Sequence, residues 1–369
     1  MENYKPVIGT PVKQLDTPCL LLDLDRLEYN FKVMADTYRD TPVKLRAHMK
    51  NVKSPLLAYM QMRTGGTVGG VCCAKVAEAE VMVEGGINDI LIPNQVVTKD
   101  KIARLCALAK RTSITVCFDS TQNLRDLSAG AVAAGVTLGV AIEVNTSMNR
   151  AGIRGVEEGV ALAKLARKLP GISFKGVMSH QSIGGMPDNE TRVLEGRRYI
   201  QMCLDVKSAV EKAGIPVELV STGETWTYDT AAKMPGVTEV EGGTYALMST
   251  FMDYMDDFKY AGLLLGTVIS TPRPGVAIGD TGMRALGAMC TYPEAWPAMD
   301  NVPGVVVAEL LEEQAVLKSK GPMPLRVGDK YLVRLGQQDL TVNRYDHYIG
   351  VRKGTVEAVW DIPARGCHN

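Results

Sequence analysis

Residues 89–120 read DILIPNQVVTKDKIARLCALAKRTSITVCFDS, and this stretch decides the fold. Its two ends, DILIPN (89–94) and ITVCFDS (114–120), are short apolar runs typical of buried strands. The segment between them, KDKIARLCALAKR, has the apolar spacing of an amphipathic helix. Two apolar strands joined by a helix are predicted to run parallel, in a sheet that is covered on both faces.

The same strand–helix unit recurs along the chain. The strand segments are VKLRAHMK (43–50), GTVGGVCC (66–73), DILIPN (89–94), ITVCFDS (114–120), LGVAIEVN (138–145), FKGVMSH (174–180), VELVSTG (217–223) and TEVEGGTYAL (238–247). Eight such units close naturally into an α/β fold of the (β/α)8 TIM barrel type. An open doubly wound sheet is the alternative.

The pattern changes at about residue 262, where longer strand-like runs and hairpin turns such as Lys353-Gly354 begin. The segment TPCLLLDLDRLEYNF (17–31) reads as a strand followed by a helix and is assigned to the barrel. We therefore predict a barrel over residues 17–261. A C-terminal β-rich domain is predicted over residues 262–369, together with residues 1–16.

Composition excludes several classes of partner. Of the 369 residues, 46% are apolar and 22% charged, and the formal net charge is zero, so nothing draws the chain as a whole to nucleic acid or to a membrane. The N-terminal segment lacks the order of a signal peptide, which indicates a cytoplasmic protein. The eight cysteines are accordingly predicted to be buried thiols rather than disulfides. A small molecule is the expected partner.

The ends of the eight strands are unusually polar. In chain order they carry His48 and Lys50, Cys72 and Cys73, Asn94, Asp119, Asn145 with Arg150, His180 with Gln181, Ser221 with Thr222, and Gly243 with Thr244. Active sites of TIM barrels are built at this rim, from the loops that follow the strands.

Two of these loops, STGETWTY (221–228) and EGGTY (241–245), combine glycines with hydroxyl side chains. Such loops let backbone N–H groups surround a phosphate, and TIM barrels often bind phosphate after strands seven and eight. Tight turns without a ligand are the alternative. Lys50 at the same rim suggests an amine that condenses with an aldehyde, although a lysine at this spacing is also common on protein surfaces.

Several segments together carry a resemblance to a known family. They are TPCLLLDLDRLEYNF, LRAHMKNVKSP, GGVCCAKVAEAE, EVNTSMNRAGI, VSTGETWTY, EVEGGTYALM and TVNRYDHYIGVRKGTVEAVWDIPARG. In this order they resemble the D-threonine aldolase and D-serine dehydratase family, which also includes D-3-hydroxyaspartate aldolase. That family belongs to the alanine racemase-like (fold type III) enzymes that use pyridoxal 5′-phosphate (PLP). The resemblance implies a barrel followed by a β domain.

The resemblance implies a role for each matching residue. The family motif Arg-x-His-x-Lys-x-x-Lys is met by Arg46, His48, Lys50 and Lys53, which makes Lys50 the Schiff-base lysine. Arg150 matches the arginine near the phenolic oxygen of the cofactor. The implied cofactor-binding residues are Lys50, His48, Arg150, Thr222, Gly223, Thr225, Tyr228, Gly243 and Thr244.

The chain departs from the family at the metal pair. The family holds a divalent metal with His-x-Cys or His-x-Asp, and here that place carries Gln337 and Asp339. An amide oxygen is a poor zinc ligand, so a retained ion is expected to be Mg2+, Mn2+ or Ca2+. The alternative is no metal. His347, eight residues beyond Asp339, is interpreted as structural.

The second departure is His180, where relatives often have tyrosine. Imidazole at this place either acts as a base or fills the space of the tyrosine ring. The predicted catalytic residues are therefore Lys50, His180 and Arg150.

The resemblance implies a PLP-dependent lyase that cleaves a D-β-hydroxy-α-amino acid into an aldehyde and an amino acid such as glycine. Dehydration to a 2-oxo acid is the first alternative, and a metal-independent racemase-type reaction at Cα is the second. A PLP carrier without turnover is a third. The resemblance also implies a homodimer in which the β domain of one subunit completes the site of the other.

Overall fold

The computed structural model describes residues 4–287 and 293–369, which divide into two compact units. Of the described residues, one unit comprises 32–50, 54–243 and 367–369, and the other comprises 4–31, 51–53, 244–287 and 293–366. Helix α1 (Leu24–Tyr38) contributes to both. Among the described residues no helix is both long and apolar enough to cross a bilayer.

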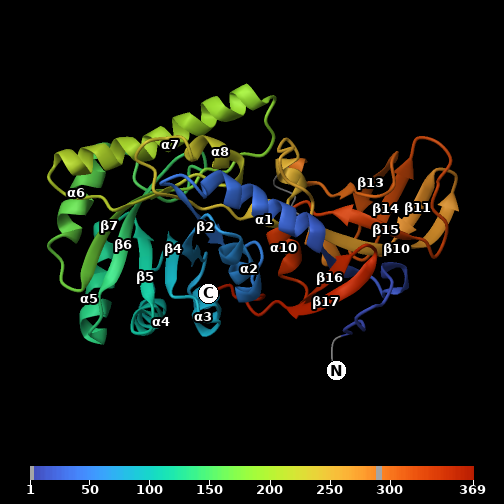
Figure 1. The fold of residues 1–369 in the computed structure, drawn as a ribbon, viewed down its shortest axis with the longest axis horizontal. Helices are drawn as coiled ribbons and strands as arrows, with labels where there is room; N and C mark the ends of the chain where they lie inside the picture. The colour runs from blue at the N-terminus through green and yellow to red at the C-terminus, as the bar shows by residue number, and fades with distance from the viewer. Residues whose placement is uncertain (1–3, 288–292) are drawn as a thin grey trace. The chain divides into compact units, whose positions relative to one another are not determined.

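The first unit is a closed parallel barrel, which confirms the predicted fold class (Figure 1). Its strands are β2 (Lys44–His48), β3 (Thr67–Cys72), β4 (Asp89–Gln95), β5 (Ser113–Phe118), β6 (Leu138–Val144), β7 (Ile172–Ser179), β8 (Leu219–Thr222) and β9 (Glu239–Val240). Each predicted strand segment overlaps one of them. The ring closes where β9 pairs with β2, with Leu45 opposite Val240.

Helices follow the barrel strands in sequence and cover them from outside (Figure 1). They are α2 (Pro55–Thr64), α3 (Val76–Glu84), α4 (Lys99–Ala109), α5 (Thr121–Ala134), α6 (Val156–Ala166), α7 (Asn189–Lys212), and the short 3-10 helix η2 (Thr225–Thr227) that runs into α8 (Tyr228–Ala231). Local sequence explains several of their ends. The Thr98 and Ser120 side chains accept hydrogen bonds from the first turns of α4 and α5, and Gly135 ends α5 in the left-handed conformation that glycine favours.

The second unit is built on a nine-stranded sheet, in agreement with the predicted β-rich domain. Its strands are β1 (Cys19–Asp23), β10 (Gly262–Arg273), β11 (Val276–Gly279), β12 (Ala298–Met299), β13 (Val305–Leu310), β14 (Ala315–Ser319), β15 (Lys330–Arg334), β16 (His347–Arg352) and β17 (Thr355–Asp361). Its short helices are η1 (Val12–Gln14), η3 (Thr244–Ala246), η4 (Thr250–Met252), α9 (Met283–Leu286), η5 (Pro293–Ala295) and α10 (Gln338–Val342). The predicted turn at Lys353-Gly354 joins β16 to β17, and both turn residues have positive φ.

The structure draws the N-terminal domain boundary differently from the sequence prediction. Strand β1 is not a barrel strand: it runs antiparallel to β10 and parallel to β16 in the sheet. Residues 17–31 therefore belong with the C-terminal unit rather than with the barrel. The reason is that Leu20, Leu21 and Leu22 are apolar on both faces, a pattern that fits a central strand of either sheet.

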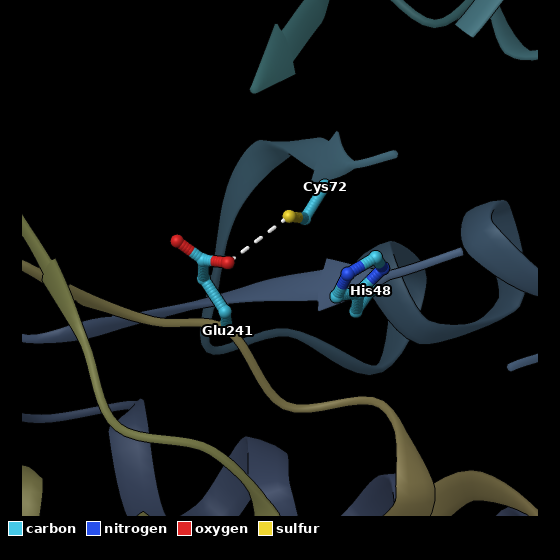
Figure 2. Close-up of side chains that lie close together, drawn as sticks. All are labelled: His48, Cys72 and Glu241. Carbon is cyan, nitrogen blue, oxygen red and sulfur yellow. Dashed lines mark hydrogen bonds between the residues drawn. The ribbon is translucent and has the colours of Figure 1, made fainter. Parts of the chain in front are cut away.

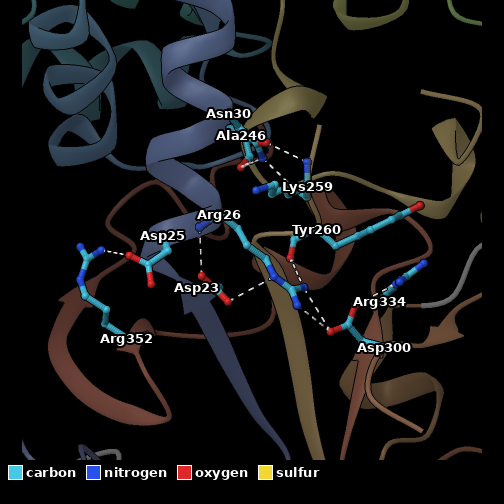
Figure 3. A network of polar contacts seen from close by, with 10 residues as sticks. All are labelled: Asp23, Asp25, Arg26, Asn30, Ala246, Lys259, Tyr260, Asp300, Arg334 and Arg352. Atoms are coloured by element: carbon cyan, nitrogen blue, oxygen red, sulfur yellow. Dashed lines mark hydrogen bonds and ion pairs between the residues drawn. The ribbon is translucent and has the colours of Figure 1, made fainter. Parts of the chain in front are cut away.

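Polar contacts hold the start of α1 to the sheet unit (Figure 3). The Arg26 guanidinium donates to the Tyr260 carbonyl at 2.9 Å and to the Asp300 carboxylate at 3.1 Å. Asp300 also accepts from Arg334 at 2.9 Å, so one nearly buried carboxylate joins two arginines. Asn30 binds the backbone of Lys259 through both ends of its amide. Apolar periodicity in the sequence does not predict polar contacts of this kind.

The cysteine prediction is confirmed for six residues and wrong for one. Cys19, Cys72, Cys73, Cys106, Cys117 and Cys203 are buried free thiols, whereas Cys367 is a partly exposed free thiol near the C-terminus. The eighth, Cys290, lies outside the described residues. Cys367 follows the last strand and so is not enclosed in the apolar core that buries the others.

Candidate active site

Backbone hydrogen bonds bring three of the predicted rim segments together within the barrel unit. The His48 N–H, at the end of β2, donates to the Gly242 carbonyl at 2.8 Å. The Glu241 N–H donates to the Gly223 carbonyl at 3.2 Å, which joins the loops that follow β8 and β9. The segment that carries Lys50 therefore adjoins both predicted phosphate loops.

Lys50 lies half-buried in the turn after β2, and its own N–H donates to Nδ1 of His48 at 3.3 Å. The charge of Lys50 acts on the side chains of His180 and Glu224. Burial lowers the pKa of His180 well below the ordinary histidine value, and the positive charges of Lys50 and Arg150 lower it further. His180, which directly follows β7, is therefore a neutral imidazole at neutral pH.

Arg150 lies in the loop after β6 and is 44% exposed. Its guanidinium is 4.0 Å from the buried Glu143 carboxylate, which also accepts from the Gln95 amide at 2.6 Å. Burial raises the pKa of Glu143, and these two partners act against that rise. The charge of Arg150, like that of Lys50, acts on His180, and its exposed guanidinium keeps donors available for a ligand.

Glu224 is a functional candidate that the sequence reading missed. It is buried within the predicted phosphate loop, and its Oε1 has no hydrogen-bond partner among the described residues. Burial raises its pKa to about 7, and the charge of Lys50 is the largest opposing effect. In the sequence, a glutamate between glycine and threonine looks like a solvent-exposed turn residue. Its burial in the structure is what distinguishes Glu224 from such a residue.

The raised pKa of Glu224 predicts a pH effect on the stability of the cofactor-free chain. Its pKa is about 7 in the folded chain and ordinary in the unfolded chain, so the folded chain binds more protons between these values. Stability from this group is complete below the ordinary glutamate pKa and is lost as pH rises through about 7. Glu224→Gln should reduce that loss in urea unfolding at several pH values.

The exposed Glu218, 67% accessible, provides the matched control. Glu218→Gln should leave the pH dependence as in the wild type, and an unchanged pH dependence in Glu224→Gln would contradict the assignment. Glu241, whose pKa burial also raises to about 7, acts in the same direction. For that reason we expect Glu224→Gln to reduce the loss without abolishing it.

The loop after β8 has a conformation that requires its glycine. Gly223 has φ of +95°, and an added Cβ would lie 3.0 Å from Cβ of Ala231.

The other predicted residues of this loop make contacts within the barrel unit. The Thr222 hydroxyl bonds to the Ser179 hydroxyl at 2.6 Å. Thr225 is buried at the start of η2. A carbonyl–hydroxyl bond at 2.8 Å joins Tyr228 to Tyr38.

The loop after β9 divides between the two units. Gly243 is buried and is the last residue of the barrel part, whereas Thr244 is counted with the sheet unit, where its carbonyl accepts from the Met248 N–H at 2.8 Å. Of the predicted cofactor residues, the structure therefore gathers Lys50, His48 and Gly243 near Gly223.

The predicted metal residues lie in the sheet unit. Gln337 precedes α10, and its Oε1 is buried with no hydrogen-bond partner among the described residues. Asp339 is half-buried, and its Oδ1 accepts from the Leu340 N–H at 3.0 Å. His347 begins β16 opposite Asp361, and its Nδ1, like Oε1 of Gln337, is buried with no hydrogen-bond partner among the described residues.

A second cluster of potential ligands lies inside the barrel unit, and the sequence reading missed it as a group. His48, Cys72 and Glu241 are all buried, and one potential ligand atom of each lies within 4.8 Å of the others. Figure 2 shows the Cys72 thiol and the Glu241 carboxylate directed toward one another, with the His48 ring beside them. The thiol–carboxylate distance is 3.2 Å.

Comparison with known proteins places this arrangement in a family. Residues 22–250 match the model described as "Alanine racemase, N-terminal domain", and residues 261–351 match "Putative serine dehydratase domain". The chain is 34% identical to 3-hydroxy-D-aspartate aldolase of Paracoccus denitrificans (strain Pd 1222), over 97% of this chain and 94% of that protein. It is 33% identical to D-threonine aldolase of Arthrobacter sp., over 97% and 95% of the two chains.

The solved structures agree with these sequence matches. The crystal structure of D-threonine aldolase from Filomicrobium marinum is 33% identical to this chain and covers 99% of it, with 100% of that chain aligned and a TM-score of 0.93. Fold, chain order and sequence are thus similar across both units. The chain belongs to the alanine racemase N-terminal domain family, within which it is similar over nearly its whole length to D-threonine and 3-hydroxy-D-aspartate aldolases.

Proposed function

We propose that Lys50 binds PLP and that the chain is a lyase that cleaves a D-β-hydroxy-α-amino acid into an aldehyde and an amino acid such as glycine. The observation that carries the proposal is the pair of backbone hydrogen bonds that brings the Lys50 segment beside both predicted phosphate loops: the His48 N–H donates to the Gly242 carbonyl at 2.8 Å, and the Glu241 N–H donates to the Gly223 carbonyl at 3.2 Å. The reaction class is supported by the similarity to two aldolases over 97% of the chain.

The residues at the rim fit this cofactor. Lys50 supplies an amine for its aldehyde, and the backbone around Gly223 and Gly243 leaves room for its phosphate because neither residue carries a side chain. The unpaired Oε1 of Glu224 is a buried acceptor that a bound ligand would satisfy. His48, Thr222, Thr225, Tyr228 and Thr244 complete the proposed cofactor residues. When bound, PLP supplies an electron sink for the bond that breaks at Cα.

The side chains around Lys50 divide the remaining tasks. His180 is neutral at neutral pH because of its lowered pKa, so its imidazole is able to accept the proton of the substrate β-hydroxyl. Arg150, whose guanidinium is exposed, would hold the phenolic oxygen side of the cofactor. Loss of the hydroxyl proton then drives cleavage between Cα and Cβ.

A divalent cation at Gln337 and Asp339 is a further part of the proposal. The buried, unpaired Oε1 of Gln337 supports it, because such an oxygen lacks the partner that buried polar atoms normally have. Two oxygen ligands suit Mg2+, Mn2+ or Ca2+ better than Zn2+. As the family resemblance implies, an ion at this place would bind the β-hydroxyl of the substrate and so assist removal of its proton.

One assay separates the competing reactions. The protein is incubated with D-threonine, D-3-hydroxyaspartate and D-serine, with and without EDTA, and the products are identified. We expect glycine from the first two substrates, and a lower rate with EDTA. Formation of a 2-oxo acid without glycine would instead establish dehydration, and racemised product alone would establish a reaction confined to Cα. No turnover, with cofactor bound, would indicate a carrier.

The oligomeric state is proposed from the family resemblance as a homodimer. Sedimentation equilibrium tests it directly, because a dimer has twice the mass of the 39.9 kDa chain. A monomer that retains full activity would contradict a site completed by a second subunit.

A further inference from the structure

Glu241 is a buried carboxylate of the barrel that the proposed mechanism does not use. Glu241 is 2% exposed and directly follows β9, the strand that pairs with β2, and Lys50 lies in the turn after β2. Its two carboxylate oxygens accept from the Ser221 hydroxyl at 2.7 Å and from the Cys72 thiol at 3.2 Å. Both donors are neutral, so these bonds leave the charge of an ionised Glu241 without a cationic hydrogen-bond donor.

Glu239, two residues earlier, shows how the fold treats a structural carboxylate. Its two oxygens accept from Nε and Nη2 of Arg46 at 2.7 and 2.9 Å, a two-point ion pair. Arg46 and His48 are two residues apart on β2, as are Glu239 and Glu241 beside them, so each pair forms a successive layer toward the rim. In the lower layer Arg46 forms a two-point ion pair with Glu239, whereas the hydrogen bonds described for Glu241 come from the neutral side chains of Ser221 and Cys72.

The upper layer lies next to the proposed cofactor lysine. One ring nitrogen of His48 lies within 4.8 Å of a Glu241 carboxylate oxygen, and Nδ1 of His48 accepts from the Lys50 N–H. Glu241 thus lies within the barrel, below the rim segment from which Lys50 projects. The cofactor pyridine nitrogen is on the opposite side of its ring from the aldehyde carbon, so it points away from the lysine.

We propose that Glu241 accepts the N–H of the protonated pyridine nitrogen of PLP, with Ser221 and Cys72 holding its carboxylate in place. This inference rests on the proposed cofactor. A buried carboxylate is stabilised by a cationic N–H donor, and the same contact keeps the pyridine ring protonated. A protonated ring withdraws electrons more strongly, which favours the negative charge that cleavage leaves at Cα.

A metal ion held by His48, Cys72 and Glu241 is the competing explanation for this cluster. Thiol ligation requires Cys72 to lose its proton, whereas the Cys72 thiol donates that proton to the Glu241 carboxylate at 3.2 Å. The structure instead shows the thiol hydrogen-bonded to Glu241 and Nδ1 of His48 bonded to a backbone N–H. These contacts are those of a hydrogen-bonded network.

The test compares PLP with its deaza analogue, in which C–H replaces the pyridine nitrogen. Both are titrated into the cofactor-free wild type and into Glu241→Gln, and dissociation constants are measured. We expect wild type to bind PLP roughly ten- to hundredfold more tightly than the analogue, as for a hydrogen bond between charged groups. In Glu241→Gln that preference should fall to nearly one.

Nitrogen NMR with cofactor labelled at the pyridine nitrogen supplies a second readout, independent of turnover. The wild type should show a protonated nitrogen and Glu241→Gln a neutral one, while Glu241→Asp should partly restore protonation. Glu218→Gln is the control, because it removes an exposed carboxylate outside the proposed site and should leave the nitrogen protonated.

The outcomes separate this inference from the proposed function. If neither compound forms a borohydride-sensitive bond to Lys50, the cofactor assignment itself fails. If PLP binds to Lys50 but its nitrogen is neutral in wild type, or stays protonated in Glu241→Gln, the role of Glu241 is overturned. A stoichiometric metal in wild type that is absent from Glu241→Gln would likewise overturn it in favour of the metal cluster.

Discussion

Lys50→Ala is expected to abolish the visible absorption of the lysine-bound cofactor and to lower the rate of aldehyde release by roughly a thousandfold or more. The reason is that the amine is the only group proposed to bond covalently to PLP and to exchange with the substrate amino group. Absorption spectra before and after borohydride reduction, followed by a single-turnover assay for glycine, measure both effects.

Lys53 is the matched control, since it lies three residues later in the same segment and is counted with the other unit. Lys53→Ala should retain the reducible band. A band that persists in Lys50→Ala would show that another amine binds the cofactor, and the central assignment would then be wrong. Retention of the fold in both variants is checked by circular dichroism.

Arg46→Ala is expected to cost about 3–5 kcal/mol of unfolding free energy, because it leaves a buried carboxylate without its partner. The Arg46 and Glu239 side chains are only 8% and 4% exposed, and Arg46 also bonds to Asp89 at 2.9 Å. Removing the guanidinium thus removes the charge that offsets Glu239. Urea unfolding at neutral pH measures the loss.

The surface pair of Arg104 and Glu80 is the control for this prediction. It has the same two-point geometry, with distances of 2.7 and 2.6 Å, but its side chains are 33% and 32% exposed. Arg104→Ala should therefore cost about 1 kcal/mol or less. Equal losses in the two variants would show that burial does not set the strength of the Arg46 pair. The presence of arginine at position 46, within the family motif, would then need an explanation other than stability.

Apolar periodicity predicted the barrel well because each barrel strand is buried over at least half of its residues and is followed by a helix or by a glycine-bearing loop. It was wrong at Leu20–Leu22, since a central strand of the second sheet has the same apolar pattern. This strand belongs to the second sheet because it pairs with residues far away in the sequence, such as Leu264 opposite Leu20. Pairing over that distance leaves no local signature.

The sequence indicates candidate residues where a reactive side chain follows a strand end, as for Lys50 and His180, and their roles are proposals. The family and the enzyme class inferred from these segments are confirmed by the comparisons. Glu224 and Glu241 were missed because both stand beside glycines in loops, where glutamate is ordinarily solvated. Their significance comes from burial and from unpaired or neutral partners, which depend on the whole barrel.

The position of β1 in the sheet also constrains how the chain can fold during synthesis. This strand emerges from the ribosome early, yet its two neighbours, β10 and β16, are made only after the whole barrel sequence. Three consecutive leucines of β1 must therefore remain without their final partners while the barrel forms. We expect this delayed pairing of the β1 leucines to make the nascent chain depend on chaperones more than its ordinary composition would suggest.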